Sequence, residues 1–338
     1  MKVIIDGRVL SHELNTGVQC YVREIINAFD KINFKYDLVK PKIFNRYFQQ
    51  IWEFTVLPYR ARCYDILFCP ANIAPFWLPE RVKLVLTLHS ISFIKYRKAY
   101  KRSFKVYYEW LVPKALKRAD RIITVSVSER KNILNIFPEY ENKIDVVRNG
   151  VNEIYLDKQR FNEKEKFILY VGSLSPGKNV EHLIKSFLEI SSRIPHTLII
   201  AGNRMPIFKE MSLKGPIQKV FFRENIGEKE LADLYASADL FVFPSFYESS
   251  GLPPLEAMSC GCPVIVSNIP ALRERCGDAA IYCDPNSVED IAEKILLVLQ
   301  NSALKEQLTK KGIERAKLFR WENSARSMVK IFEGVYGT

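Results

Sequence analysis

Short segments that are almost wholly apolar alternate along the chain with longer segments in which apolar residues recur every three or four positions. The longer segments are typical of helices with one buried face, and the short ones of parallel strands that helices cover on both sides. The expected strands are 3–6, 65–68, 83–88, 121–126, 145–147, 167–172, 196–202, 219–222, 240–243, 263–266 and 279–283. The expected helices are 17–29, 104–118, 180–193, 228–238, 254–261 and 287–301. This alternation predicts an α/β fold.

The alternation occurs in two blocks of similar size. A chain of 338 residues is too long for one ordinary hydrophobic core, so two domains of roughly 150 residues are expected. The turn signal Asn149-Gly150 and the polar stretch 152–166 that follows it mark the junction and a hinge. We therefore predict two doubly wound, Rossmann-like domains, residues 1–151 and 152–319, that face each other across a cleft.

The net charge of +12 lies wholly in the first half of the chain. Residues 1–150 hold 26 Lys and Arg against 14 Asp and Glu, whereas residues 151–338 hold 24 of each. The excess is densest in 93–121, where aromatic residues are interleaved with it, and this pattern suits an anionic membrane surface. Nucleic acid is the competing anion, and a solvated helix with core aromatics is the alternative without a ligand. The basic residues expected to meet a membrane or its acceptor are Lys95, Arg97, Lys98, Lys101, Arg102 and Lys105.

Composition excludes several classes of protein. The apolar and charged fractions, 48% and 26%, are those of a soluble globular chain, and no apolar run approaches the roughly 18 residues of a spanning helix. The first residues meet a charge too early for a secretory leader, and the seven cysteines form neither a CxxC pair nor a cluster with histidine. We expect a cytoplasmic protein without structural disulfides or zinc. No known RNA- or DNA-binding module occurs, so nucleic acid is not an expected partner.

Ligands of open parallel sheets bind beyond the carboxyl ends of the strands, and one such end carries the loop GSLSPGKN (172–179). The loop nearly matches the phosphate-loop pattern, but Asn179 replaces the hydroxyl that would hold magnesium in an ATPase. Backbone amides at a helix start, together with Lys178, still predict an anion site that suits a diphosphate. The absence of GxGxxG weakens a dehydrogenase interpretation, and no Asp-x-Asp pair or other metal-binding pattern is present.

A second strand end carries ESSGLPPLE (248–256), in which Glu248 and Glu256 flank a tight turn. We expect a helix to begin near Pro253 or Pro254, with Glu256 in its first turn. The amides of the turn would then face a ligand, and both carboxylates suit sugar hydroxyls. One glutamate could instead only complement the helix dipole. The turn residues expected at the ligand are Ser249, Ser250, Gly251 and Leu252.

His89 follows the expected strand 83–88, where a ligand would lie, although a lone histidine is more often structural. With these motifs in place, the chain resembles glycosyltransferase family 4, which has the GT-B fold, and within it the bacterial mannosyltransferase-like branch of surface-polysaccharide and lipopolysaccharide biosynthesis. The segments that carry the resemblance are IDGRVL (5–10), TGVQCYVREI (16–25), LTLHS (86–90), RADRIITVSVSER (118–130), DVVRNGV (145–151), YVGSLSPGKN (170–179), HTLIIAG (196–202), SFYESSGLPPLEAMSCGCPVIVSN (245–268) and RWENSARSMVKIF (320–332).

The resemblance implies a retaining, metal-independent transfer of a sugar from a nucleoside diphosphate donor that the C-terminal domain binds. It places Glu248 at the donor sugar and Glu256 at the ribose, and Lys178 and Arg204 at the diphosphate. Further donor contacts would come from Gly17, Gly172, Ser173 and Asn179, and His89 would lie beside the reacting sugar. The last segment, 320–338, would pack back on the N-terminal domain. GDP-mannose is the first donor candidate by branch, and UDP- and dTDP-sugars remain open.

The chain departs from the family pattern at the donor loops. Gly177 stands where an arginine commonly precedes Lys178, and serines replace the more common Gly-Phe after Glu248. Arg204 or Arg8 would have to supply the missing charge. The expected function is hexose transfer to a lipid-linked or surface-polysaccharide glycan at the inner face of the cytoplasmic membrane, by a peripherally bound enzyme. Alternatives are a sugar-nucleotide epimerase on a GT-B scaffold, and a non-enzymatic protein that binds through its basic surface.

Overall fold

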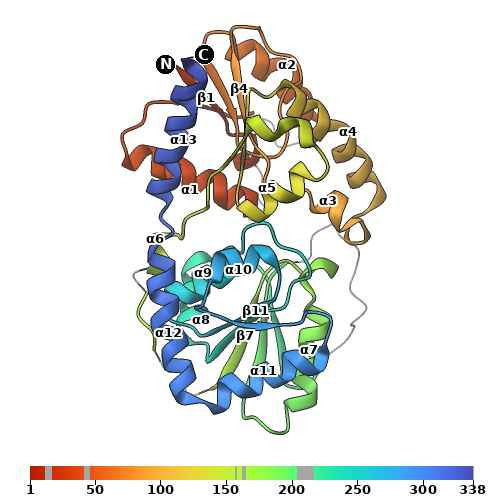
Figure 1. Cartoon of the computed structure of the whole chain (residues 1–338), viewed down its shortest axis with the longest axis vertical. Helices are drawn as coiled ribbons and strands as arrows, with labels where there is room; N and C mark the ends of the chain where they lie inside the picture. Colours follow the sequence, from red (N-terminus) through yellow and green to blue (C-terminus); the bar gives the residue numbers. More distant parts are fainter. Residues whose placement is uncertain (12–16, 42–45, 157, 162–164, 204–216, 338) are drawn as a thin grey trace. The chain divides into compact units, whose positions relative to one another are not determined.

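The chain folds into two compact units in the computed structural model (Figure 1). The N-terminal unit comprises Met1–Ile94, Lys105–Gly150 and Arg320–Thr338, and the C-terminal unit comprises Lys95–Phe104 and Val151–Phe319. The structure describes all residues except 12–16, 42–45, 157, 162–164, 204–216 and 338, and it describes the backbone alone at 46, 47, 50 and 98.

The N-terminal unit is built on a six-stranded sheet with the order β2-β1-β3-β4-β5-β6, and every pairing between these strands is parallel. The strands are β1 (Val3–Asp6), β2 (Asp37–Val39), β3 (Ile66–Cys69), β4 (Lys83–Thr87), β5 (Arg121–Thr124) and β6 (Ile144–Val146). The helices that lie wholly or mostly in this unit are α1 (Gly17–Lys31), α2 (Arg46–Ala61), α3 (Ser92–Lys95), α4 (Arg102–Arg118), α5 (Val127–Leu134) and α13 (Trp321–Tyr336), with short 3₁₀ segments at Arg8–Ser11 and Pro138–Lys143. The 3₁₀ segment Arg97–Ala99, between α3 and α4, belongs to the C-terminal unit.

The last helix, α13, packs beside α1 in the N-terminal unit (Figure 1). Its apolar residues recur at helical spacing and are buried in the core of that unit, where the Phe332 ring lies 5.3 Å from the ring of Phe68. At the start of the helix, a Cβ on Gly150 would lie 2.3 Å from the Trp321 nitrogen, so only glycine fits this crossing. The segment 320–338 thus contributes its apolar face to the N-terminal unit.

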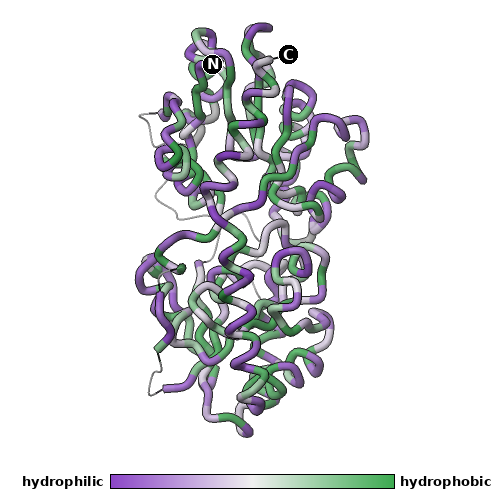
Figure 2. Tube along the Cα trace, turned by 60° about the vertical axis from the view of Figure 1, so that its left-hand side comes forward, coloured by the Kyte–Doolittle hydropathy of each residue, from purple (hydrophilic) through white to green (hydrophobic). Residues whose placement is uncertain are grey.

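The C-terminal unit contains a second six-stranded parallel sheet, with the order β9-β8-β7-β10-β11-β12. Its strands are β7 (Phe167–Val171), β8 (Thr197–Ala201), β9 (Val220–Arg223), β10 (Leu240–Phe243), β11 (Val264–Ser267) and β12 (Ile281–Cys283). Its helices are α6 (Glu153–Leu156), α7 (Val180–Ile190), α8 (Glu228–Ser237), α9 (Leu252–Ser259), α10 (Pro270–Cys276), α11 (Val288–Gln300) and α12 (Ser302–Lys317), with a 3₁₀ turn at Pro176–Lys178. Hydrophilic and hydrophobic residues alternate along the helices, as expected for helices that cover a sheet (Figure 2).

The expected α/β class with two parallel sheets is confirmed. Three details differ from expectation. The polar stretch 152–166, expected as a hinge, opens with the short helix α6, whose Tyr155 is buried in the C-terminal core. The segment Lys95–Phe104 groups with the C-terminal unit, although it lies within the expected first domain, 1–151. Helix α9 begins at Leu252, so Glu256 is its fifth residue and lies beyond the first turn.

Both sheets have a point at which the strand order reverses, and such points are where open α/β sheets bind ligands. In the C-terminal unit the reversal falls between β7 and β10, which are hydrogen-bonded neighbours. In the N-terminal unit it falls between β1 and β3. The loops that follow β7 and β10 contain the two motifs that the sequence singled out, GSLSPGKN and ESSGLPPLE. The fold therefore brings these motifs together at one edge of one sheet.

Candidate functional site

The two strand-end motifs meet in an ion pair between Lys178 and Glu248. The Lys178 ammonium contacts the Glu248 carboxylate, although 70 residues separate them in the chain. The Lys178 side chain is 25% exposed and that of Glu248 only 9%, so the pair is largely shielded from water. The ammonium also lies 5.4 Å from the centre of the Phe243 ring, within the range of a cation–π contact. A cation and a carboxylate therefore stand together where the strand order reverses.

The loop that carries Lys178 begins at a close approach of two strand ends. A Cβ on Gly202 would lie 1.8 Å from the Gly172 carbonyl oxygen, so the loops after β7 and β8 can pass each other only without a side chain. The Leu174 amide donates to the Asn203 carbonyl oxygen at 3.1 Å, which fixes the next part of the loop. Ser173 accepts a hydrogen bond at its backbone oxygen from the buried Tyr170 hydroxyl. These contacts hold the start of the phosphate-type loop in one conformation.

Asn179 serves the protein scaffold. Its side-chain amide donates to the backbone oxygens of Pro244 at 2.9 Å and Pro285 at 2.7 Å, and the residue is 4% exposed. These bonds tie the loop after β7 to the loops after β10 and β12. The backbone of Asn179 adopts the left-handed conformation just before α7. The Asn179 side chain therefore positions the loop, and its contact with the donor stays a prediction.

The turn after Glu248 is held by an arginine that the sequence did not single out. Arg275, buried on α10, donates from Nε to the Ser250 backbone oxygen at 2.6 Å and from Nη2 to the Ser250 Oγ at 2.9 Å. Gly251 caps α9 in the left-handed conformation, with φ of 70° and ψ of 48°, and a Cβ there would lie 2.8 Å from Leu272. Contacts with Arg275 and Leu272 of α10 thus fix the turn 249–252, which leads directly into α9.

Glu256 is oriented by a buried tyrosine. The Tyr235 hydroxyl on α8 donates to the Glu256 carboxylate at 2.9 Å, and Tyr235 is fully buried. Burial and the adjacent carboxylate hold the pKa of Tyr235 well above its usual range, so the phenol stays protonated and remains a donor. Glu248 and Glu256 therefore have different partners, a lysine and a phenol, which is consistent with two different binding roles.

In the N-terminal unit, His89 follows β4 and is buried. Its Nε2 lies 2.7 Å from the Pro70 carbonyl oxygen, which can only accept, so Nε2 carries the proton. Its backbone amide donates to the Asn72 side chain, and the Tyr21 ring packs edge-on at 4.4 Å. Burial lowers the pKa of His89 to about 4, so the imidazole is neutral at neutral pH. Gly17, the first residue of α1, is exposed and has open space where a Cβ would lie.

Neither arginine considered as a replacement for the loop arginine can be assigned to the diphosphate. Arg204 lies outside the described residues. Arg8 is buried in the N-terminal unit, where its Nε lies 3.0 Å from Glu53 and 3.9 Å from Asp6. Two buried carboxylates therefore surround this one cation, and the Arg8 charge is already balanced.

The basic residues expected at a membrane are on the surface. Lys95, Arg97, Lys101 and Arg102 are exposed, and Lys105 is partly exposed. The side chain of Lys98 lies outside the described part of the structure. In the parts of the chain that the structure describes, no helix is long and apolar enough to cross a bilayer. The same described parts contain no group of three or more His, Cys, Asp or Glu arranged to hold a metal ion, and metal-independent transfer stays a prediction.

Comparison with known proteins identifies the family. Residues 17–153 match the family described as Glycosyltransferase Family 4, and residues 151–315 match Glycosyl transferases group 1. O-antigen chain mannosyltransferase B of Escherichia coli is 31% identical over 278 residues, which cover 76% of this chain and 72% of that protein. The chain belongs to glycosyltransferase family 4. O-antigen chain mannosyltransferase RfbU of Salmonella typhimurium is also 31% identical, over 60% of this chain and about half of that protein, 56%.

Solved structures show that this family 4 glycosyltransferase has the GT-B fold. Sucrose-phosphate synthase from Thermosynechococcus elongatus superposes with a TM-score of 0.76 and 20% identity, over 99% of both chains. Anabaena Alr3699/HepE, solved with UDP and glucose, gives a TM-score of 0.71 and 14% identity, over 99% of this chain and 100% of that one. At these identities the likeness shows the fold alone.

Three residues that make contacts described above were not singled out from the sequence of the glycosyltransferase. Arg275 is separated from Ser250 by 25 residues and lies on the short helix α10, and Tyr235 lies within the expected helix 228–238. Glu53 belongs to α2, which the sequence did not predict. The signal that could have found Glu53 is an acidic residue within an apolar helical face, since a buried carboxylate needs a partner.

Proposed function

We propose that this glycosyltransferase moves a hexose, with mannose the first candidate, from a nucleoside diphosphate donor to a lipid-linked or surface-polysaccharide glycan, with retention at the transferred carbon. The observation that carries the proposal is the pairing of Lys178 and Glu248 where the strand order of the C-terminal sheet reverses. Two relatives are O-antigen mannosyltransferases by name, which supports the sugar and the acceptor class. A structural neighbour contains UDP and glucose, which supports the donor class.

The pair assigns complementary roles to its two members. Charge builds up on the diphosphate as it leaves, and a cation already in place stabilises that charge without reorganisation, which is the role of Lys178. Glu248 can accept hydrogen bonds from hydroxyls of the donor sugar while it remains beside the lysine. Glu256, oriented by Tyr235, can accept hydrogen bonds from the ribose hydroxyls. Arg275 keeps the backbone turn at Ser250 in place for the sugar and phosphates.

In this proposal His89 helps to shape the site and does not transfer a proton. A neutral imidazole whose Nε2 proton is directed to Pro70 cannot serve as a charged acid at neutral pH. Its strand-end location and its fixed amide suit a role in shaping the site around the reacting sugar. In the proposed transfer, the nucleophile is a hydroxyl of the glycan acceptor.

A thermal-shift screen across nucleotide sugars tests the donor proposal. A ligand at 100 times its Kd stabilises the folded state by about 2.7 kcal/mol, which corresponds to roughly 5–11 °C for a unit of this size. We expect GDP-mannose, or else one UDP- or dTDP-sugar, to raise the melting temperature of the wild type but not that of Lys178→Ala. If no nucleotide sugar and no nucleoside diphosphate shifted the wild-type transition, the donor site proposed here would be wrong.

We further propose that the enzyme works at the cytoplasmic face of a membrane and binds anionic lipid there peripherally. The exposed residues Lys95, Arg97, Lys101 and Arg102 belong to the C-terminal unit. The N-terminal unit exposes large apolar side chains, with Trp77 61% and Trp110 53% exposed. The Phe76 ring lies 6.3 Å from that of Trp110, and the Lys114 ammonium lies 3.4 Å from the centre of the Trp110 ring. Aromatic rings beside lysines match the boundary between lipid tails and anionic headgroups.

Vesicle binding tests the membrane proposal. Each basic residue near an anionic surface contributes about 1 kcal/mol, so Lys101→Ala with Arg102→Ala should weaken binding to phosphatidylglycerol vesicles roughly 30-fold. The matched control, Lys310→Ala with Lys317→Ala, removes two exposed lysines of α12 and should leave binding within about twofold. Binding is measured by sedimentation and by the shift of tryptophan fluorescence. Equal affinity of both double variants, or no preference for anionic over neutral vesicles, would refute the proposal.

A further inference from the structure

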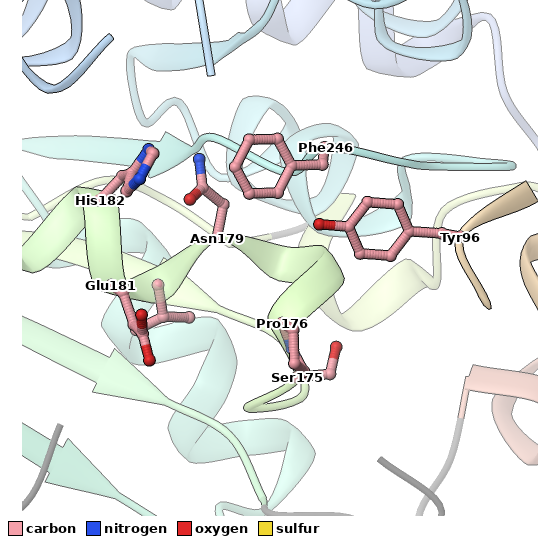
Figure 3. A pocket seen from close by; sticks show the side chains of 8 residues that line it. Tyr96, Ser175, Pro176, Asn179, Glu181, His182 and Phe246 are labelled. Carbon is pink, nitrogen blue, oxygen red and sulfur yellow. The ribbon is translucent and has the colours of Figure 1, made fainter. Parts of the chain in front are cut away.

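A cavity of about 190 Å³ lies in the C-terminal unit beside the loop that carries Lys178 (Figure 3). Side chains from three separate segments line it. Of the residues expected at the donor, Asn179 is among them, and its side chain donates to the backbone oxygens of Pro244 and Pro285. Figure 3 shows His182 and Asn179 on one side of the cavity, and Phe246 and Tyr96 on the other. The residues that matter for its chemistry are Tyr96, Ser175, Pro176, Asn179, His182 and Phe246.

Three of the eight residues that line the cavity, Tyr96, His182 and Phe246, contribute flat rings to its walls. The Tyr96 and Phe246 rings lie at 21° to each other with centres 6.1 Å apart, and His182 meets Phe246 edge-on at 5.7 Å. Flat apolar surfaces complement the C–H faces of a pyranose ring, which are its apolar part. Polar groups at the lining, the Tyr96 hydroxyl and Ser175 among them, suit the hydroxyls at the edge of such a ring.

The volume of the cavity suits a ligand with one six-membered ring. An engineered cavity of about 150 Å³ in another protein takes up benzene, so 190 Å³ accommodates one six-membered ring. Pockets that enclose ligands of drug size, a class that includes nucleotides, occupy roughly 300–1,000 Å³. A nucleotide sugar is therefore too large for this cavity, whereas one hexopyranose unit, with part of its edge open to solvent, fits.

Buried hydrogen bonds hold the lining in place. The His182 Nδ1 lies 3.0 Å from the Pro285 carbonyl oxygen, which can only accept, so Nδ1 donates. Asn179 donates to the same carbonyl oxygen, as described above. The Phe246 amide donates to the Gly177 carbonyl oxygen at 3.0 Å, so the ring is tied to the loop that precedes Lys178. A lining fixed in this way binds a ligand without a large ordering cost.

The cavity is built on the same two loops as the donor site. Pro176 and Asn179 flank Lys178 in one loop, and Phe246 precedes Glu248 by two residues in the other. A ring in the cavity would therefore contact the backbone segments that place the ion pair. We propose that the cavity is a subsite for one sugar ring of the glycan acceptor. The assignment of that ring to the acceptor rests on the proposed function, whereas the binding of a sugar ring rests on the cavity itself.

Ligand-observed NMR titration with methyl α-D-mannopyranoside and other methyl hexopyranosides tests the subsite directly. We expect at least one glycoside to bind the wild type, and expect Phe246→Ala and Tyr96→Ala each to raise its Kd at least tenfold. The matched control is Phe161→Ala, which removes a 40% exposed ring of the same unit and should leave the Kd unchanged. Phe246→Tyr keeps the flat surface and should retain binding within about threefold.

Two further readouts separate this proposal from the donor proposal. Both alanine variants should keep the wild-type melting temperature shift with the nucleotide sugar, which also shows that they are folded. In transfer assays they should raise the KM for the glycan acceptor at least tenfold and leave the KM for the donor within about twofold. Absence of glycoside binding to the wild type, or equal binding to Phe246→Ala and Tyr96→Ala, would overturn the subsite even if donor binding and transfer are found.

Discussion

Replacing Lys178 by alanine should lower kcat/KM for sugar transfer by roughly 10²–10³-fold, the loss typical when one preorganised charge donor is removed from a developing anion. The effect has two parts. The leaving diphosphate loses its cation, and the Glu248 carboxylate loses the partner that balances its charge beside the phosphates. Glu248→Ala should lower transfer to a similar extent, because the donor sugar loses a hydrogen-bond acceptor. Transfer is measured as labelled sugar incorporated into glycan.

A double variant tests whether Lys178 and Glu248 act together or independently. Because the side chains contact each other, Lys178→Ala with Glu248→Ala should cost much less than the product of the single losses. The matched control is Lys158→Ala, which breaks an ion pair with Asp233 in the same unit and should change kcat/KM by no more than about twofold. Turnover near the wild-type value in both Lys178→Ala and Glu248→Ala would contradict the site assignment.

Arg8→Ala should destabilise the N-terminal unit by about 3–5 kcal/mol, because it removes the cation that lies between two buried carboxyl groups, those of Asp6 and Glu53. Glu53 is fully buried and Asp6 is 1% exposed, so water cannot replace the guanidinium. All four tryptophans, at 52, 77, 110 and 321, belong to this unit, so urea unfolding followed by tryptophan fluorescence reports on it. The control Lys31→Ala breaks an exposed pair with Glu322 and should cost at most about 1 kcal/mol.

The same cluster predicts a pH dependence of stability. Burial raises the pKa of Glu53 to about 8, above its value in the unfolded chain, so the folded state binds a proton that the unfolded state has lost. The resulting stabilisation is fully present below pH 4.5 and is lost as the pH rises through 8. Glu53→Gln should remove this part of the decline and leave the variant more stable than the wild type near pH 8. Parallel stability curves from pH 5 to 8 for Glu53→Gln and the wild type would contradict the assignment.

The strands were predictable because parallel strands buried on both faces are nearly pure apolar runs, as in β10 and β7. The elements that the sequence missed have weak or interrupted patterns. Helix α2 contains Pro58, and α10 has seven residues and begins at Pro270. Helix α12 buries only a thin stripe that includes Leu308, Gly312 and Ala316, so its composition is mostly polar. Tertiary contacts, which a local pattern does not contain, stabilise these elements.

The candidate site was predictable where chemistry coincides with a strand end. Lys178 and Glu248 lie in the loops that directly follow β7 and β10, and Glu256 lies in the helix that comes after the second loop, so topology places them at one edge of the sheet. The direction of Asn179 could not be predicted, because an amide at a helix start can face either the ligand or the scaffold, and here two carbonyl oxygens bind it. Arg275 was missed because both of its bonds to Ser250, one to the backbone oxygen and one to the Oγ, join segments 25 residues apart and have no local sequence signature.

Transfer of labelled sugar tests the central claim most directly. The nucleotide sugar that gives the largest thermal shift, carrying a radiolabelled sugar, is incubated with the wild-type enzyme and a lipid-linked glycan fraction, and the products are separated and counted. We expect the label to move to the glycan, with one nucleoside diphosphate released for each sugar transferred. Label that stays on the nucleotide, as the original sugar or as its epimer, would contradict glycosyl transfer, and the epimer would indicate an epimerase on the same scaffold.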